Sequence, residues 1–172
     1  MENTTQDSSG LSKKEALIEH LIDIRRRILD LAGKIPPEKQ GQVFLGEWSA
    51  RELLAHLAGW DVTNIQAARE VMTGKLPGFY AYIDKDWASY NARLVAEYGR
   101  ADFTELIELV TETHRQLIAY LFGQASAELW KDRGIRARGW KVTIGRLLEA
   151  EIKDEEVHYQ QLSKFVESFH HR

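Results

Sequence analysis

The sequence contains no cysteine. Disulfide bonds, cysteine-ligated zinc, iron–sulfur clusters and a cysteine nucleophile are therefore excluded. The absence of cysteine is consistent with a reducing compartment, and we expect a cytoplasmic location. Any thiol chemistry would have to use a separate small molecule, because the chain carries no thiol of its own.

Long apolar runs and an excess of positive charge are also missing. No stretch approaches the roughly 18 apolar residues of a membrane-spanning helix, and the N-terminal residues lack the basic and apolar pattern of a signal peptide. The chain carries 23 basic and 26 acidic residues, a formal net charge of -3. This balance gives no overall basic footprint for nucleic acid. We therefore expect neither a membrane nor a nucleic acid as a partner.

Proline, the strongest helix breaker, occurs only at positions 36, 37 and 77. No long alternation of apolar and polar residues indicates a strand. Apolar residues instead recur every three or four positions, and capping boxes begin with Ser12 and Ser49. The spacing predicts helices over residues 13–32, 50–72, 103–122 and 144–168, a further helix over 85–98 and a loop over 131–141.

Four long amphipathic helices predict an all-α fold, an antiparallel four-helix bundle. Residues 1–11 are polar and small, so they are expected to form a flexible N-terminal tail. Residues 12–169 are expected to form a single bundle domain. The long middle segment leaves open whether the helices follow a simple up-down-up-down order.

Polar side chains interrupt the apolar face of the last predicted helix. At about 100° per residue, Glu151, Asp154 and Glu155 fall close to His158 on that face. Burying unpaired charges costs several kcal/mol, so the cluster requires a partner. A divalent cation is one solution, because Asp154 and His158 are four residues apart and can reach one ion. Arginines from another helix, or a solvent-filled cleft, are the alternatives.

His56 occupies the inward face of the second predicted helix, beside Leu53 and Leu57. It is either a third metal ligand or a hydrogen-bonded core residue. His114 leaves the same two alternatives open. The other candidates serve the same hypothetical site: Glu155 as a reserve ligand, Glu151 as an acceptor that orients a ligand imidazole, and Trp60 and Tyr159 as walls of a pocket.

Two groups of basic residues give weaker indications of function. Arg25, Arg26 and Arg27 are too few for a nucleic-acid patch and are expected to span a solvated face. The basic residues of segment 131–141 either steer an anionic ligand or belong to a charged loop: Arg133, Arg136, Arg138 and Lys141. The sequence contains neither a GxxxxGK phosphate-binding motif nor a GxSxG nucleophile elbow.

Three segments resemble the DinB-like superfamily. EWSARELLAHLAGWD, at residues 47–61, is similar to the signature of its second helix, with the Trp-Ser cap, leucine pair, histidine and following tryptophan in register. DKDWASYNARLVAE, at 84–97, resembles a stretch of the ClbS/DfsB-type (DUF1706) proteins. DEEVHYQQL, at 154–162, resembles the His-Tyr stretch of the last helix. The most similar branch holds those proteins and the N-terminal domains of mycothiol-dependent maleylpyruvate isomerases.

The resemblance implies a four-helix bundle that forms a homodimer. It also implies a divalent metal, zinc or nickel, held by His56, Asp154 and His158. Two positions depart from the family pattern. Many members carry histidine at the position of Asp154, although the isomerase branch uses a carboxylate there, and some carry a second histidine at the position of Leu162.

Three functions follow from the resemblance. The first is a metal-dependent transferase or isomerase that acts on a small reactive molecule with a thiol cosubstrate such as mycothiol or bacillithiol. The second is a protective hydrolase or binding protein of the ClbS/DfsB type, without an obligatory metal. The third is a non-enzymatic, dimeric interaction module.

Overall fold

The computed structural model describes residues 12–82, 84 and 87–170. The expected N-terminal tail at residues 1–11 and the expected helix start at residue 85 lie outside the described residues. None of the helices over the described residues combines the length and the hydropathy of a membrane span.

Four long helices build the fold, and their bounds agree closely with the sequence-based prediction. They are α1 (Lys13–Ala32), α2 (Ala50–Met72), α4 (Phe103–Phe122) and α6 (Ile144–Glu167). The capping boxes of α1 and α2 form as predicted, with Ser12 and Ser49 at the N-caps, and a third caps α4 at Asp102. The prediction of an all-α four-helix bundle is confirmed.

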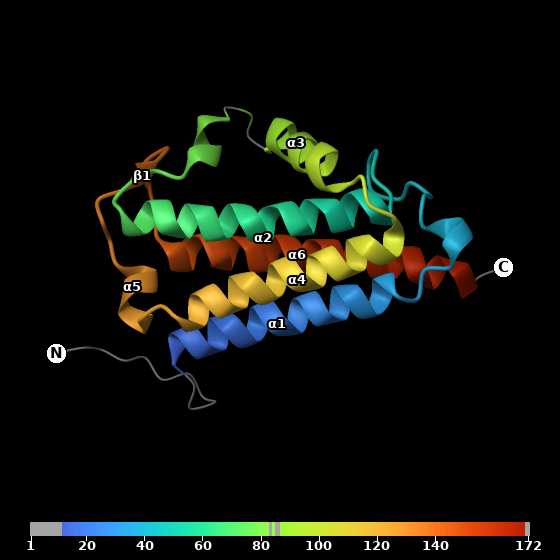
Figure 1. Ribbon diagram of the computed structural model, residues 1–172, viewed down its shortest axis with the longest axis horizontal. Coiled ribbons are helices and arrows are strands. Elements are labelled where there is room, and N and C mark those ends of the chain that lie inside the picture. Colours follow the sequence, from blue (N-terminus) through green and yellow to red (C-terminus); the bar gives the residue numbers. More distant parts are fainter. Residues whose placement is uncertain (1–11, 83, 85–86, 171–172) are drawn as a thin grey trace.

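The helices run in two opposite pairs (Figure 1). The ion pair of Lys13 with Glu149 joins the N-terminal ends of α1 and α6, which therefore run in the same direction. Likewise, Arg51 near the start of α2 donates to the carbonyl of Ala101, just before α4. The parallel course of α2 and α4 follows from their connection, which passes through η2 (Gly78–Ala81) and α3 (Ala88–Tyr98) back along α2.

The remaining elements are short. They are η1 (Pro37–Lys39), α5 (Ser126–Trp130), η3 (Ser168–His170) and an antiparallel hairpin of β1 (Arg136–Ala137) and β2 (Trp140–Lys141). The hairpin corrects the prediction of a loop over 131–141. Its turn residues Arg138 and Gly139 both have positive φ, 51° and 82°, as a two-residue type I′ turn requires. Strands of two residues are too short to produce an alternating pattern in the sequence.

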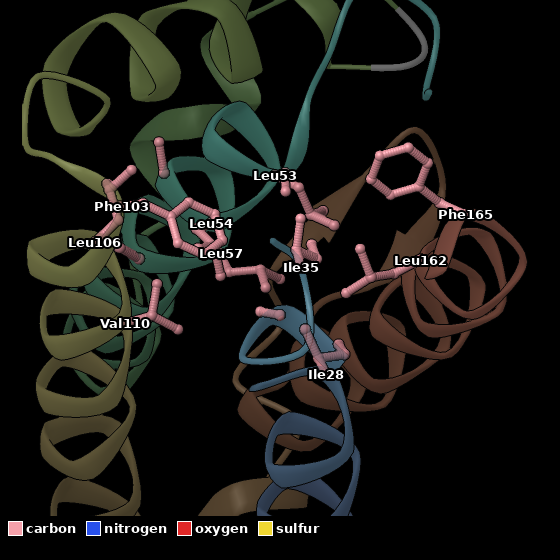
Figure 2. Packing of buried hydrophobic residues seen from close by; sticks show 14 of the residues in the cluster. Ile28, Ile35, Leu53, Leu54, Leu57, Phe103, Leu106, Val110, Leu162 and Phe165 are labelled. Carbon is pink, nitrogen blue, oxygen red and sulfur yellow. The ribbon is translucent and has the colours of Figure 1, made fainter. Parts of the chain in front are cut away.

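The apolar core consists of two main clusters along the bundle. At one end, all four long helices contribute to a cluster that includes Ile28, Leu57, Leu106 and Leu162 (Figure 2). The cluster at the other end contains Leu21, Val71, Leu117 and Leu148.

Arg25 lies inside the bundle with only 1% of its surface exposed, which corrects the expectation of a solvated face. Its guanidinium donates two hydrogen bonds to Asp61, at 2.7 and 3.0 Å, and two to Glu155, at 3.0 and 2.7 Å. Thr113 adds a further hydrogen bond to Asp61 at 2.8 Å. This network ties α1, α2, α4 and α6 together between the two apolar clusters. Arg26 and Arg27, its sequence neighbours, pair with acidic residues at the surface.

The crossover helix α3 packs on the outer side of α2. Gly59 permits the close approach, because a Cβ at that position would lie 2.8 Å from the Cβ of Leu94. A third apolar cluster, with Trp60, Phe79 and Tyr90, fills this contact. The crossover thereby places aromatic side chains beside the middle of α2 and α6.

The buried network predicts that substitutions of two neighbouring arginines will differ greatly in their effect on the free energy of unfolding. Arg25→Met leaves the carboxylates of Asp61 and Glu155 buried without a cation, so we expect the free energy of unfolding to fall by about 3–5 kcal/mol. Arg26→Met, on the solvent side of the same helix, is the matched control and should change stability little. Urea unfolding followed by circular dichroism measures both. Equal stability of the two variants would contradict the structural role given to Arg25.

Candidate functional site

His56, Asp154 and His158 meet in the middle of the bundle, where α2 and α6 run antiparallel. His56 projects from α2, and Asp154 and His158 project from adjacent turns of α6. The Nε2 atoms of the two histidines are 3.3 Å apart. Asp154 Oδ2 lies 3.4 Å from His56 Nε2 and 3.2 Å from His158 Nε2. The structure thus brings together the three residues that the sequence proposed as a metal site.

These three separations fit the donor set of a tetrahedral metal. Bonds of about 2.0–2.1 Å to nitrogen and oxygen place neighbouring ligands of a tetrahedral zinc about 3.3–3.4 Å apart. The three atoms already form a triangle of that size, so they would hold such a cation with little rearrangement. Two imidazoles and one carboxylate suit Zn²⁺ or Ni²⁺ better than Mg²⁺, which prefers oxygen ligands.

The hydrogen bond at Nδ1 of His158 affects whether Nε2, on the other side of the ring, can bind a metal. His158 Nδ1 lies 3.0 Å from Gln161 Oε1, so in the neutral ring this acceptor favours the tautomer with the proton on Nδ1, which leaves the Nε2 lone pair for a metal. His56 Nδ1 is buried without a hydrogen-bond partner among the described residues, and the ring packs beside Trp48 with centroids 5.0 Å apart. The sequence analysis missed Gln161, although it follows His158 by three residues on the same helical face.

The environment sets opposite pKa shifts for the two histidines. Burial lowers the pKa of His56 below its usual value. Burial acts in the same direction on His158, but the hydrogen bond and negative charge of Asp154 outweigh it, so the pKa of His158 is raised. For Asp154, burial opposes ionisation, yet hydrogen bonds from both histidines hold its pKa well below the usual range. A carboxylate is therefore present at the triangle at neutral pH.

A cavity of about 270 Å³ opens beside the triangle, and His56 and Asp154 form part of its wall. The Asp154 side chain is 52% exposed, so the triangle is accessible from this side. A metal with these three ligands would keep a fourth position for water or substrate facing an accessible space.

Aromatic side chains form much of the cavity wall. Trp60 was expected there, and its indole Nε1 donates to Asn91 Oδ1 at 2.8 Å. Phe79, Tyr80 and Trp87 were not identified from the sequence. They come from the crossover between α2 and α4, where the abundance of aromatic residues in segment 79–91 was the available signal. Their position depends on contacts with α2 that no local pattern specifies.

Glu151 also lines the cavity, but its surroundings differ from the expectation. It was expected to orient a ligand imidazole, whereas the described partner of His158 Nδ1 is Gln161 Oε1, at 3.0 Å. The Glu151 side chain is buried, and its Oε1 has no hydrogen-bond partner among the described residues. Burial raises its pKa well above the usual value, and the negative charges of Glu155 and Asp154 raise it further.

Three other candidates lie away from the triangle. Glu155 was the expected reserve ligand, but it faces α1 and gives both carboxylate oxygens to Arg25. Tyr159 packs under the Arg27 guanidinium, 4.0 Å from Cζ to the ring centroid, on the side of α6 that faces α1. Adjacent residues of a helix point about 100° apart. Glu155 therefore points away from Asp154, and Tyr159 points away from His158. His114 lies on α4, 3.6 Å from the Asp61 carboxylate.

Solved structures of three proteins share the fold. An uncharacterised protein from Escherichia coli UTI89 has 16% identity and a TM-score of 0.72, covering 90% of this chain and 93% of its own. The colibactin self-resistance protein ClbS, crystallised with a dsDNA, has 18% identity and a TM-score of 0.72, covering 88% and 93%. The mycothiol-dependent maleylpyruvate isomerase has 14% identity and a TM-score of 0.69, covering 87% of this chain and 60% of its own.

The expectation that nucleic acid is excluded as a partner is wrong. It rested on the formal net charge of -3, yet ClbS, which has this fold, is crystallised with a dsDNA. Net charge describes the whole chain, whereas contact with a phosphate backbone requires only a local basic surface. The charge balance therefore does not exclude nucleic acid for a protein of this fold.

At the level of sequence, no curated protein matches the chain. The family model described as the DinB superfamily matches residues 20–162, which include His56 and both candidate ligands of α6. The chain is therefore a member of the DinB superfamily.

Proposed function

We propose that this protein binds one divalent metal, zinc or nickel, through His56, Asp154 and His158, and acts as a metal-dependent enzyme on a small molecule. The observation that carries the proposal is the triangle of His56 Nε2, His158 Nε2 and Asp154 Oδ2, with sides of 3.2 to 3.4 Å. The accessible cavity beside it supports a catalytic rather than a purely structural metal, because structural zinc sites are closed by a fourth protein ligand.

A divalent metal held by His56, Asp154 and His158 would activate a water or a thiol as a nucleophile near neutral pH. The protein's own residues would orient the reacting groups and limit their contact with water. Asp154 provides the negative charge at the triangle, and Gln161 favours the tautomer of His158 that leaves Nε2 free. Trp60 and its neighbours form an apolar wall that limits the water around a substrate.

We further propose a low-molecular-weight thiol, such as mycothiol or bacillithiol, as cosubstrate of a transferase or isomerase reaction. The fold shared with the mycothiol-dependent maleylpyruvate isomerase supports this class. The absence of cysteine requires the thiol to come from outside the chain. A cytoplasmic location, which the same absence favours, would supply such thiols.

A protective role like that of ClbS is the second candidate function. The fold shared with a self-resistance protein that was crystallised with a dsDNA favours it. On this chain, the hairpin of β1 and β2 presents Arg136, Arg138 and Lys141 at the surface together with Trp140, which is 74% exposed. Basic side chains interleaved with an aromatic ring suit a phosphate backbone and bases. Binding of duplex DNA by the purified protein separates this role from the first.

Removal of either imidazole should abolish metal retention. For His56→Ala and His158→Ala we expect metal content close to zero and affinity lowered by more than about 100-fold, because two ligands remain. Gln161→Ala should weaken affinity less, by about tenfold to 100-fold, because it only orients a ligand. The measurement is elemental analysis of protein purified without a histidine tag.

His20→Ala is the matched control, because this histidine lies at the surface of α1, where it pairs with Glu156. It should retain metal like the unaltered protein. Unchanged metal content in both ligand variants, with circular dichroism showing intact helices, would refute the site.

Metal affinity should fall as the pH falls, because a protonated imidazole cannot bind a metal. His158, whose pKa is raised, is protonated first, so the loss begins above the usual histidine value of about 6.5. Affinity then falls about tenfold per pH unit, and more steeply once the pH also passes the lowered pKa of His56. Competition with a zinc-sensitive dye between pH 5 and 8 measures the profile. An affinity that does not change over this range would contradict the ligand assignment.

A further inference from the structure

Asn91 brings a carboxamide into the aromatic part of the cavity wall. It lies near the start of the crossover helix α3, and its neighbours in the wall include Trp60, Phe79 and Trp87. Asn91 Oδ1 accepts the hydrogen bond from Trp60 Nε1 at 2.8 Å. Because an indole N–H can only donate, this contact determines which end of the carboxamide faces Trp60.

The other end of the carboxamide, Nδ2, is available to a ligand. An asparagine amide carries two N–H donors, and no hydrogen bond joins Asn91 Nδ2 to another of the described residues. The side chain is half-buried, so it is accessible from the cavity that it lines. Pockets for small molecules are mostly apolar, with a few polar groups that fix the orientation of the ligand. Asn91 Nδ2 is such a group, and it requires an acceptor atom on the ligand.

The surroundings of Asn91 favour an uncharged acceptor. None of the described residues that line the cavity is a lysine or an arginine, so the wall offers no cationic side chain to a carboxylate or a phosphate. Trp60 links Asn91 to the triangle: its ring centroid is 6.3 Å from that of His56, and its Nε1 reaches Asn91. The amide and the triangle therefore occupy different parts of the wall. A carbonyl oxygen is the neutral acceptor that suits an amide donor at this place.

We propose that the cavity binds a small uncharged carbonyl compound, whose carbonyl oxygen accepts a hydrogen bond from Asn91 Nδ2 and whose apolar body packs against Trp60, Phe79 and Trp87. Asn91 is then a residue that determines the specificity of the pocket. This inference deepens the proposed function, on which it rests for the meaning of the cavity as a substrate pocket. The hydrogen bond to Asn91 requires neither the metal nor turnover, so the two proposals can fail separately.

Two probes of nearly equal shape isolate the acceptor oxygen. Acetophenone has a carbonyl oxygen where α-methylstyrene has a methylene group, and each is small enough for a cavity of about 270 Å³. Ligand-observed nuclear magnetic resonance titrations with the full-length protein, purified without a histidine tag, give the two dissociation constants. Because α-methylstyrene is the more hydrophobic probe, the test compares how a substitution changes the ratio of the two constants.

Asn91→Asp keeps an acceptor for Trp60 Nε1 at nearly unchanged volume but removes both amide donors. We expect acetophenone to bind about tenfold more weakly relative to α-methylstyrene, because an acceptor replaces the donor that faces the carbonyl oxygen. Asn91→Leu removes the donors without adding charge and should lower the relative affinity about fivefold. Glu97→Leu, on the exposed side of α3, is the matched control and should leave the ratio unchanged within about twofold. Thermal unfolding and elemental analysis show whether the variants are folded and keep the same metal content.

Three results would overturn the inference. The first is that the unaltered protein binds neither probe. The second is a ratio that does not change in folded Asn91→Leu and Asn91→Asp. The third is a change confined to Asn91→Asp, which would reflect its added charge rather than a lost hydrogen bond. A selective loss of acetophenone binding in both variants, at unchanged metal content, supports the inference. The same loss in a protein that never retains metal refutes the metal proposal alone.

Discussion

The need to neutralise charge inside the bundle governs this structure. One face of α6 carries Glu151, Asp154, Glu155 and His158 at positions where a simple bundle would have apolar residues. An uncompensated charge there would cost several kcal/mol, a large part of the stability of a small domain. The three carboxyl groups have different surroundings in the fold. Arg25 pairs with Glu155, two histidines contact Asp154, and Glu151 Oε1 has no hydrogen-bond partner in the part of the chain that the structure describes.

These different environments follow from helical geometry and from the chain path. Adjacent residues on α6 point about 100° apart, so Glu155 reaches α1 while Asp154 faces α2. The crossover through α3 makes α2 and α4 parallel neighbours and lays its aromatic residues against α2 beside Asp154. A buried, ion-paired network thus lies on one side of the candidate ligands and an accessible cavity on the other.

Much of the fold could be predicted because its signals are local. Capping boxes at Ser12 and Ser49 and the spacing of apolar residues specify the ends and faces of the long helices. The spacing of Asp154 and His158 predicted a shared target, the inward position of His56 made it a candidate third ligand, and the family resemblance independently implied the same three residues. The geometry is consistent with that prediction, and metal binding itself stays a prediction.

The rest depends on contacts between distant segments. Arg25 has the same periodic position as the apolar residues of α1, but a run of three arginines resembles a solvated surface until Asp61 and Glu155 are placed beside the first. The wall formed by Phe79, Tyr80 and Trp87 requires the crossover path, which no helical or strand period specifies. The hairpin has strands of two residues, too few for any pattern to be recognised.

The central claim is that the triangle formed by His56, Asp154 and His158 is a metal centre. Anomalous diffraction at the zinc and nickel absorption edges, from crystals of protein purified without a histidine tag and supplied with both metals, tests it most directly. The account predicts one strong anomalous peak about 2.0–2.2 Å from His56 Nε2, His158 Nε2 and Asp154 Oδ2. A map without a peak among these atoms, with their side chains ordered, would contradict it.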